Sequence, residues 1–312
     1  MMQDVTKSMD LPRAKVSIGL PVFNGERYLK QALDSILSQT FQDFELVISD
    51  NGSNDGTEII CRAYATRDRR IRYQRQPYTH GVTWNFRQVA LLASGDYFLW
   101  VAADDTLDPT YVKRCLEVLQ RHPEVVLCYS KAIVMDEEGN CLRREDQQLD
   151  AASEKPHERF RELIRMDHNC GALFGLIRTG ILKRTSIHGD FADSDRCVLA
   201  ELALYGQYHQ IPEYLFCHRE HSQRVTRIYP LRQERMFQLH PERPPKIVFP
   251  HFRQFWEYIS GIHRAPLKWT ARVRCYSQMM SWLRDNANRL ANDLKFVLYQ
   301  CARPLWRTDY VR

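Results

Sequence analysis

The sequence predicts an α/β fold, with a mostly parallel central sheet, helices on both faces and a C-terminal helical extension. Three observations support this prediction. Short apolar runs alternate with segments whose apolar residues recur at steps of three and four. Several of these runs end in acidic or amide side chains, and beyond about residue 240 the strand pattern gives way to long helical stripes. Strands that alternate with helices form parallel sheets that are covered on both faces.

Each element is expected from its own residues. A first helix is expected over 27–39, where Leu29, Leu33 and Ile36 recur at helical spacing. Pro109 opens another that runs to about 121, because proline suits a first helical turn. The remaining expected elements are strands at 16–22, 44–49, 71–73, 97–101, 125–129 and 214–216, helices at 57–65, 82–93, 158–166 and 195–205, an extended segment at 172–177 and a turn at 136–140.

A boundary between two units is expected near residues 230–245, which include a Pro-rich stretch. The first unit, 14–230, holds the alternating elements, and the second, 231–312, is helical and basic. From residue 241 onward there are 13 Lys and Arg against 5 Asp and Glu, a charge of +8 in a chain of net +6, so the rest carries −2. This extension carries an apolar stripe formed by Trp269, Val273, Tyr276, Met280 and Leu283. Three interpretations are open: packing on the first unit, peripheral contact with an anionic membrane, or pairing with another subunit.

Composition narrows the class of protein. The chain is 44% apolar and 11% aromatic, as folded proteins are. No stretch of 18 residues is free of charge and the first residues lack an apolar core, so neither a spanning helix nor a signal peptide is expected. Nine scattered cysteines without a CxxC pair favour reduced thiols, a cytoplasmic location and no structural zinc. No nucleic-acid-binding motif accompanies the basic charge, so nucleic acid is not an expected partner.

Polar loops follow the first two strands. The first is Leu20-Pro-Val-Phe-Asn-Gly-Glu and the second is Ser49-Asp-Asn-Gly-Ser-Asn-Asp-Gly-Thr. Ligands of open α/β sheets bind at the carboxyl ends of strands, and the carboxylate of Asp50 can accept a hydrogen bond from the imide N–H of a base. The alternative is an Asn-Gly turn followed by an Asx-rich helix cap. That alternative accounts for Asn54 and Asp55, but not for an acid that ends an apolar strand.

Asp104 and Asp105 stand side by side at the exit of the strand at 97–101. Carboxylates repel each other, so such a pair predicts a divalent cation with oxygen ligands. The alternative is an acidic pair that precedes the helix at 109 and favours its dipole. No GxGxxG follows a strand and no GxxxxGK[ST] occurs, so the phosphate loops of dinucleotide and P-loop sites are missing.

Together, in this order and spacing, these segments resemble the family 2 glycosyltransferases, whose catalytic domain has the GT-A fold. The resemblance covers about residues 14–222 and is most specific over the first 105, above all in KVSIGLPVFNGERYLKQALDSILSQTFQDFELVISDNGSNDGT. It implies a Rossmann-like, nucleotide-binding catalytic domain at 14–230. It also implies an inverting, metal-dependent enzyme. Such an enzyme moves a sugar from a nucleoside-diphosphate donor to a hydroxyl of a glycan or lipid-linked acceptor in surface polysaccharide biosynthesis. UDP is the nucleotide expected first.

The resemblance also assigns roles to residues. Asp50 would face the base, Asp104 the ribose, and Asp105 would bind Mg or Mn through the diphosphate. The full set expected to contact the donor is Pro21, Val22, Asn24, Glu26, Asp50, Asn51, Asp104 and Arg219, and the set expected to bind the metal is Asp105 and His221. Arg219 and His221 match an Arg-x-His element of the family that folds over the donor phosphates. One position departs, because many members have Asp-x-Asp-Asp where this chain has Ala102.

Asp195 is the expected catalytic base. In the family an acid opens a helix near the acceptor, and Asp195 precedes Leu199, Leu202 and the helix-ending Gly206. Ser194 stands where many members have Glu. The alternative interpretation is helix capping by Asp193 or Ser194. As a base, Asp195 would take the proton of the attacking hydroxyl, and a single displacement would invert the anomeric configuration.

Two other functions remain open on this evidence. A non-catalytic module that binds nucleotide sugars or glycans is favoured only by Ala102. A sugar nucleotidyltransferase would need a Gly-rich phosphate loop, which LPVFNGE is not. The location expected from the family is the cytoplasm, or the inner face of the membrane if the basic extension contacts lipid. Oligomer formation is left open.

Overall fold

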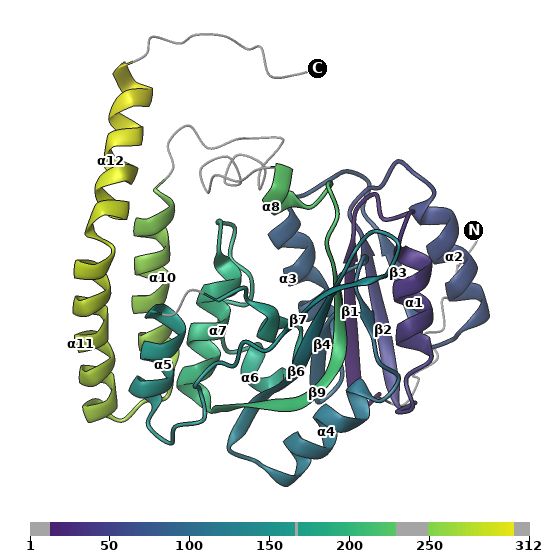
Figure 1. Cartoon of the computed structure of the whole chain (residues 1–312), viewed down its shortest axis with the longest axis horizontal. Coiled ribbons are helices and arrows are strands. Elements are labelled where there is room, and N and C mark those ends of the chain that lie inside the picture. Colours follow the sequence, from purple (N-terminus) through teal and green to yellow (C-terminus); the bar gives the residue numbers. More distant parts are fainter. Residues whose placement is uncertain (1–12, 166–167, 229–248, 303–312) are drawn as a thin grey trace, which may run out of the picture.

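The computed structural model describes residues 13–165, 168–228 and 249–302. One mixed sheet runs through the molecule in the order β3-β2-β1-β4-β8-β6-β9-β5, with β7 paired to β6 (Figure 1). Its strands are β1 (Val16–Val22), β2 (Phe44–Asp50), β3 (Ile71–Arg75), β4 (Tyr97–Trp100), β5 (Thr106–Leu107), β6 (Val125–Met135), β7 (Cys141–Glu145), β8 (Leu176–Arg178) and β9 (Gln207–Arg219). The helices are α1 (Leu29–Leu37), α2 (Thr57–Arg67), α3 (Val82–Leu92), α4 (Tyr111–Arg121), α5 (Pro156–Arg165), α6 (Thr179–Leu182), α7 (Ser194–Tyr205), α8 (Val225–Ile228), α10 (Pro250–Arg264), α11 (Trp269–Asp285) and α12 (Ala287–Ala302).

The half of the sheet that carries the predicted donor residues is parallel. β1 lies between β2 and β4, with Val22 opposite Asp50 and Gly19 opposite Trp100. The carboxyl ends of these strands therefore meet at one edge, which brings the loops after them together. β8 joins this half to β6 through antiparallel pairs on both of its sides. The predicted α/β class is confirmed.

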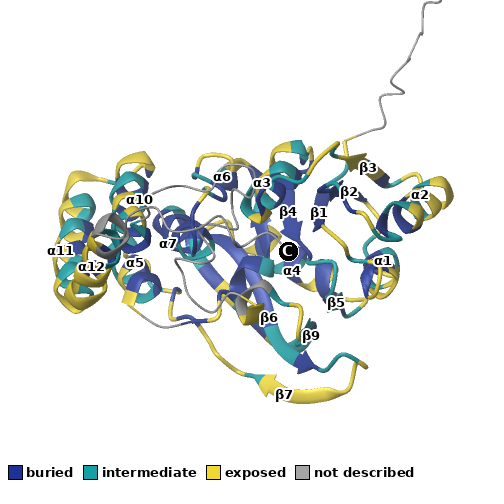
Figure 2. Cartoon of the chain, turned by 90° about the horizontal axis from the view of Figure 1, so that it is seen from above, coloured by how far each residue is buried: buried dark blue, intermediate teal, exposed yellow. Residues whose placement is uncertain are grey.

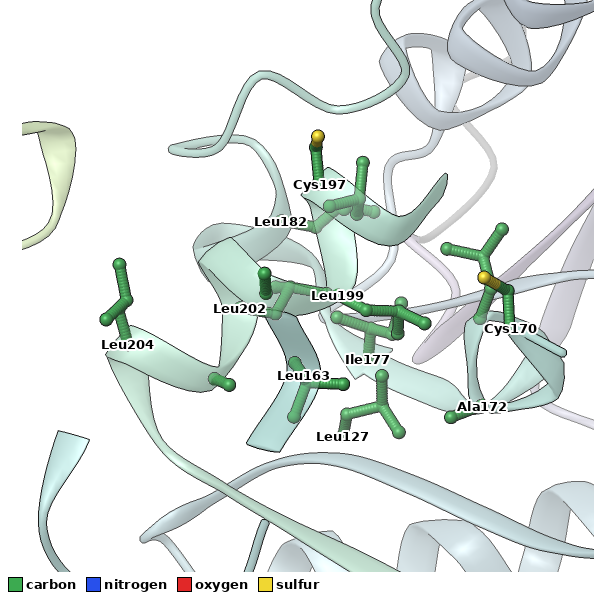
Figure 3. Close-up of a cluster of buried hydrophobic side chains, with 14 of the residues drawn as sticks. Leu127, Leu163, Cys170, Ala172, Ile177, Leu182, Cys197, Leu199, Leu202 and Leu204 are labelled. Carbon is green, nitrogen blue, oxygen red and sulfur yellow. The ribbon is translucent and has the colours of Figure 1, made fainter. Parts of the chain in front are cut away.

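Helices cover both faces of the sheet, as Figures 1 and 2 show. Apolar residues of α1, α2 and α4 pack in one buried cluster, and those of α3, α6 and α7 pack in the other. The second cluster also receives side chains from α5, α10 and α11. Figure 3 shows the part around α7, where Leu199 and Leu202 lie among Leu127, Leu163 and Ile177. This packing fixes the helix that carries Asp195.

The C-terminal helices pack on the first unit through α5 and α7 (Figure 1). Arg264 of α10 donates to both carboxylate oxygens of the buried Glu201 on α7, at 2.8 Å each. Asp293 of α12 is fully buried and accepts from the backbone N–H of His251 at 2.8 Å, which joins α12 to the start of α10. The predicted boundary between 230 and 231 lies outside the described residues. Within the described ranges, no helix combines the length and apolar character needed to cross a bilayer.

The predicted apolar stripe of α11 is only partly buried. Tyr276 and Leu283 pack against the core cluster, beside the buried Cys275, Met279 and Trp282. Trp269 is 74% and Met280 67% exposed. Two other expectations also differ from the structure. The segment expected to be extended begins as a short 3₁₀ turn over Gly171–Phe174, and only Leu176–Arg178 forms a strand. β9 is much longer than the expected 214–216, because it pairs along nearly all of β6.

Candidate functional site

The loop after β1 is tied to the loop after β2 by the predicted donor residues themselves. The side-chain oxygen of Asn24 accepts from the backbone N–H of Asn54 at 2.9 Å, and Asn24 itself adopts a positive φ of 50°. Glu26 accepts from the backbone N–H of Gly56 at 2.8 Å. Both side chains therefore connect the loop after β1 to the loop after β2. Pro21 and Val22 are buried in β1 beside them, so their side chains belong to the core.

Asp50 and Asn51 at the end of β2 tie this edge to β3 and to the segment before α3. The Asp50 carboxylate is fully buried and accepts from the backbone N–H of Ser53 at 2.9 Å and from the hydroxyl of Tyr73 at 2.7 Å. The Asn51 amide donates to the carbonyl of His80 at 2.7 Å and accepts from its N–H at 2.9 Å. These bonds fix the strand ends and the segment that leads into α3. The contact between Asp50 and a base stays a prediction.

Asp104 and Asp105 both contact the end of β9 and the loop that follows it. Asp104 Oδ2 lies 2.8 Å from His221 Nε2, and the Asp104 side chain is 29% exposed. Asp105 is 1% exposed and lies 3.3 Å from His218 Nδ1. Its carboxylate also accepts from the backbone N–H of Arg219 at 2.9 Å. The structure thus brings the adjacent Asp104 and Asp105 together with His218, Arg219 and His221, which lie more than a hundred positions away in the sequence.

Arg219 has a different environment from the one expected. Its guanidinium stacks over the Tyr28 ring at 4.6 Å and donates to Gln31 at 2.6 Å and to the carbonyl of Glu137 at 3.0 Å. It also donates to the carbonyl of Asp104 at 3.0 Å, and the residue is only 1% exposed. In this arrangement Arg219 joins loops under the acidic pair. Its contact with donor phosphates stays a prediction.

The two acids differ in their electrostatics. Burial acts to raise the pKa of Asp104, but the hydrogen bond and charge of His221, with the charge of Arg224, outweigh it and lower the pKa. For Asp105, burial and the neighbouring charge of Asp104 raise the pKa against the opposing effect of His218. The charged form is therefore favoured at Asp104, which is the more exposed of the two.

The residues at the acidic pair fit a divalent cation in part. Asp104 supplies an oxygen and His221 a nitrogen, 2.8 Å apart, and within the described part of the chain the buried Nδ1 of His221 has no hydrogen-bond partner. A carboxylate oxygen suits Mg and Mn, whereas an imidazole nitrogen is more typical of Zn, Cu, Fe and Ni. Over the described ranges, no group of three or more His, Cys, Asp or Glu is arranged so that it could hold a metal ion. Any cation here would need oxygens from the donor.

Asp195 lies in the first turn of α7 and lines a cavity of about 590 Å³. Its wall on one side comes from α3, with Val82 and Phe86. On another side it comes from the end of β9 and the loop that follows, with His218 and Arg224. The predicted base therefore opens on the same cavity as residues that touch the acidic pair.

Three residues that line this cavity, His188, His218 and Arg224, were not among the expected site residues. His218 bridges Asp105 and the guanidinium of Arg224. His188 lies in the cavity wall with its Nδ1 3.0 Å from the hydroxyl of Ser194, directly before Asp195. A single histidine carries no spacing signal, so the sequence could not have singled these two out. Arg224 was noted only as a weaker candidate beside Arg219.

His188 predicts a pH dependence of stability. Burial lowers its pKa to about 4, against the opposing charge of Asp195, whereas an unfolded histidine titrates near 6.5. The folded state therefore binds fewer protons than the unfolded state between these values. Its contribution is complete above pH 6.5 and is lost as the pH falls toward 4, about 3 kcal/mol in all. Denaturant unfolding at pH 7 and pH 4.5 should show this loss in wild type and lack it in His188→Gln. An equal pH dependence in both proteins would contradict it.

Comparison with known proteins identifies the family. The sequence profile described as glycosyl transferase family 2 matches residues 17–183, more than half of the 312-residue chain. The chain belongs to glycosyl transferase family 2. Its matched region runs from β1 through α6 and so contains the loops after β1 and β2 and the acidic pair.

Similar proteins of the family are known from several organisms. An uncharacterised glycosyltransferase of Rickettsia conorii is 27% identical over 140 residues, which are 44% of this chain and 22% of that protein. The glycosyltransferase GlyA of Streptococcus pneumoniae is 34% identical over 99 residues, 32% of this chain and 14% of GlyA. The matched stretches therefore span less than a quarter of these relatives.

Solved structures share the fold. TarS 1–349 of S. aureus in complex with UDP-GlcNAc aligns with a TM-score of 0.62 at 15% identity, over 92% of this chain and 81% of that one. The mannosyltransferase PcManGT of Pyrobaculum calidifontis, in complex with GDP-Man and Mn²⁺, aligns with a TM-score of 0.53 at 14% identity, over 93% and 84%. With the family match, they confirm the predicted GT-A architecture with added C-terminal helices.

Proposed function

We propose that this chain is an inverting glycosyltransferase that moves a sugar from a nucleoside-diphosphate donor to an acceptor hydroxyl. UDP is the first nucleotide to test. The observation that supports this best is that one cavity joins these residues. It is lined by α3, which follows the nucleotide edge, by the end of β9, which touches the acidic pair, and by Asp195 of α7. A donor with its nucleotide at the sheet edge would direct its sugar toward the base. UDP-GlcNAc bound to TarS supports the donor class.

Asp195 is the base in this proposal. It lies in the first turn of α7, which is held in place by its packing in one buried apolar cluster with α5 and α10. A carboxylate within hydrogen-bond reach of the acceptor hydroxyl takes its proton as the oxygen attacks the anomeric carbon. One displacement inverts that carbon, so a second carboxylate nucleophile is not required.

The donor diphosphate belongs at the acidic pair. Asp104 and His221 would hold the Mg or Mn there in the present geometry, with Asp105 directly behind them as the ligand that the resemblance implies. When bound, the cation supplies charge that stabilises the leaving diphosphate. Arg224 lies beside this position through His218 and adds positive charge to it. PcManGT, whose structure contains GDP-Man and Mn²⁺, supports a cation beside the donor diphosphate.

A thermal-shift panel tests the proposal. The full chain is mixed with UDP, UDP-glucose, UDP-galactose, UDP-GlcNAc or GDP-mannose, with and without Mn, and release of nucleoside diphosphate is then followed with glycan and lipid-linked acceptors. Stabilisation by one donor, followed by acceptor-dependent release, is the expected result. Stabilisation without any release would support the non-catalytic binding module. Absence of any nucleotide effect would contradict both functions.

We also propose that the acceptor is reached at an anionic membrane, through the exposed face of α11. Trp269, Val273 and Met280 lie at i, i+4 and i+11, so they share one face, and all three are exposed. The unit that carries them has a charge of +8 from residue 241 onward. Apolar side chains among basic residues are typical of helices that lie on anionic lipid.

Sedimentation with liposomes checks the membrane proposal. Wild type is expected to bind phosphatidylglycerol vesicles at least about tenfold more tightly than phosphatidylcholine vesicles, because each basic residue near the surface adds about 1 kcal/mol. The double variant Trp269→Ser with Met280→Ser should lose most of that binding. Ile59→Ser is the matched control, since Ile59 is 75% exposed on α2, away from the extension. Equal binding by the double variant and wild type, or a concentration-dependent dimer that covers this face instead, would contradict the proposal.

A further inference from the structure

The cavity contains a buried polar atom that the proposed mechanism does not use. His188 is 5% exposed, and its Nε2 has no hydrogen-bond partner among the described residues. Its other ring nitrogen, Nδ1, lies 3.0 Å from the hydroxyl of Ser194. A buried polar atom without a partner costs free energy, so its retention in a cavity wall indicates a partner that arrives with a ligand.

Two aromatic rings hold the imidazole of His188 in place. The ring stands edge-on to Phe86 of α3 and to Trp100 of β4, with 5.3 Å between centroids in each case. The indole of Trp100 in turn donates to the carbonyl of Phe86 at 2.9 Å. His188 is thus held between the nucleotide half of the sheet and the start of α7. A sugar attached to a diphosphate at the acidic pair would lie between that pair and Asp195, beside this wall of the cavity.

The chemistry of the site favours a neutral hydroxyl as the ligand. Burial lowers the pKa of His188 to about 4, so the imidazole is uncharged at neutral pH. An uncharged imidazole nitrogen donates or accepts one hydrogen bond and does not attract phosphate. The Phe86 ring lines the same wall and offers an apolar surface for the face of a sugar ring. Aromatic rings beside a single hydrogen-bonding atom are typical of small-molecule pockets.

We propose that His188 recognises the donor sugar, through a hydrogen bond between its Nε2 and one hydroxyl of the transferred ring. This inference rests on the proposed function and adds to it a residue that selects among donors. The hydroxyl group satisfies the buried nitrogen only when the sugar is bound. A site that hydrogen-bonds a substrate hydroxyl rejects the analogue that lacks it, because its buried polar group is then left unpaired.

Calorimetric titration of UDP and of UDP-sugars tests this inference in the absence of acceptor. The ratio of UDP-sugar affinity to UDP affinity isolates the contribution of the sugar. UDP-glucose, UDP-galactose and UDP-GlcNAc are the probes, each with Mn. The variants are His188→Gln, whose amide reaches the position of Nε2, and His188→Asn and His188→Phe, which leave that position without a polar atom. His251→Gln is the control, because His251 is a buried histidine paired with Asp293, away from the cavity. Thermal unfolding of each variant verifies its fold.

The expected result is a UDP-sugar that wild type binds more tightly than UDP. In the asparagine and phenylalanine variants, the ratio of UDP-sugar affinity to UDP affinity should fall about tenfold while UDP affinity stays unchanged. The glutamine variant and His251→Gln should keep most of the wild-type ratio. An unchanged ratio in all His188 variants would overturn the inference and leave the proposed function intact. The same holds if wild type binds no UDP-sugar more tightly than UDP. If wild type binds no nucleotide at all, the proposed function fails and the inference fails with it.

Discussion

Replacement of Asp195 with asparagine should lower the rate of sugar transfer by about 10²–10⁴-fold while donor affinity stays within about twofold of wild type. The amide has nearly the same size as the carboxylate but cannot take a proton. Asp195 lies at the first turn of α7 in the cavity wall, where its carboxylate accepts from the backbone N–H of Arg196 at 2.8 Å. Steady-state kinetics and calorimetric donor titration measure the two effects separately.

Asp193→Asn is the matched control for this variant. Asp193 precedes α7, lines the same cavity and is the alternative cap of the helix. If the acids at the start of α7 serve only the helix, the two variants should lose similar stability and retain transfer. If Asp195 is the base, transfer is lost in Asp195→Asn at an unchanged melting temperature. Wild-type turnover by Asp195→Asn would remove Asp195 from the mechanism.

Asparagine substitutions at the acidic pair should separate metal binding from structural support. Both variants are expected to lose turnover by about 10²-fold or more, because the charge that meets the leaving diphosphate is disturbed. Asp104→Asn should abolish the Mn-dependent part of UDP binding with little change in stability, since its side chain is 29% exposed. Asp105→Asn should also destabilise the fold by about 1–3 kcal/mol. Its carboxylate is buried and accepts from the backbone of Arg219.

Calorimetry of UDP with and without Mn, together with denaturant unfolding, distinguishes these outcomes. A loss of Mn-dependent binding in Asp105→Asn at unchanged stability would assign the metal to Asp105, as the resemblance implied. Retention of turnover in both variants would contradict a metal site at this pair. Arg224→Lys serves as a control, because it keeps the positive charge beside His218 without altering either acid.

Much of the fold follows from local patterns. The strands at 16–22 and 97–101 were predictable because their apolar runs are buried on both faces, and parallel strands place their ends at one edge. The true length of β9 was not predictable, because its pairing with β6 depends on a distant partner and includes irregular register. The exposed stripe on α11 was not predictable either. A helix with apolar residues on more than one face does not reveal which of them the neighbouring helices will cover.

The candidate site divides in the same way. The grouping of Asp50, Asp104 and Asp105 at one edge follows from the order of the strands, so the sequence could predict it. The detailed task of each side chain could not be predicted. Arg219 resembles a phosphate ligand in its motif, yet the structure buries it over Tyr28. His188 became visible only as an unpartnered nitrogen in a cavity wall.

A crystal structure of Asp195→Asn with Mn and the UDP-sugar that most stabilises the protein tests the central claim most directly. The account predicts the nucleotide at the carboxyl ends of β1 and β2, the diphosphate and cation at Asp104, and the anomeric carbon in the cavity, open to residue 195. A nucleotide bound away from this edge, or a sugar that points out of the cavity with residue 195 out of reach, would contradict it.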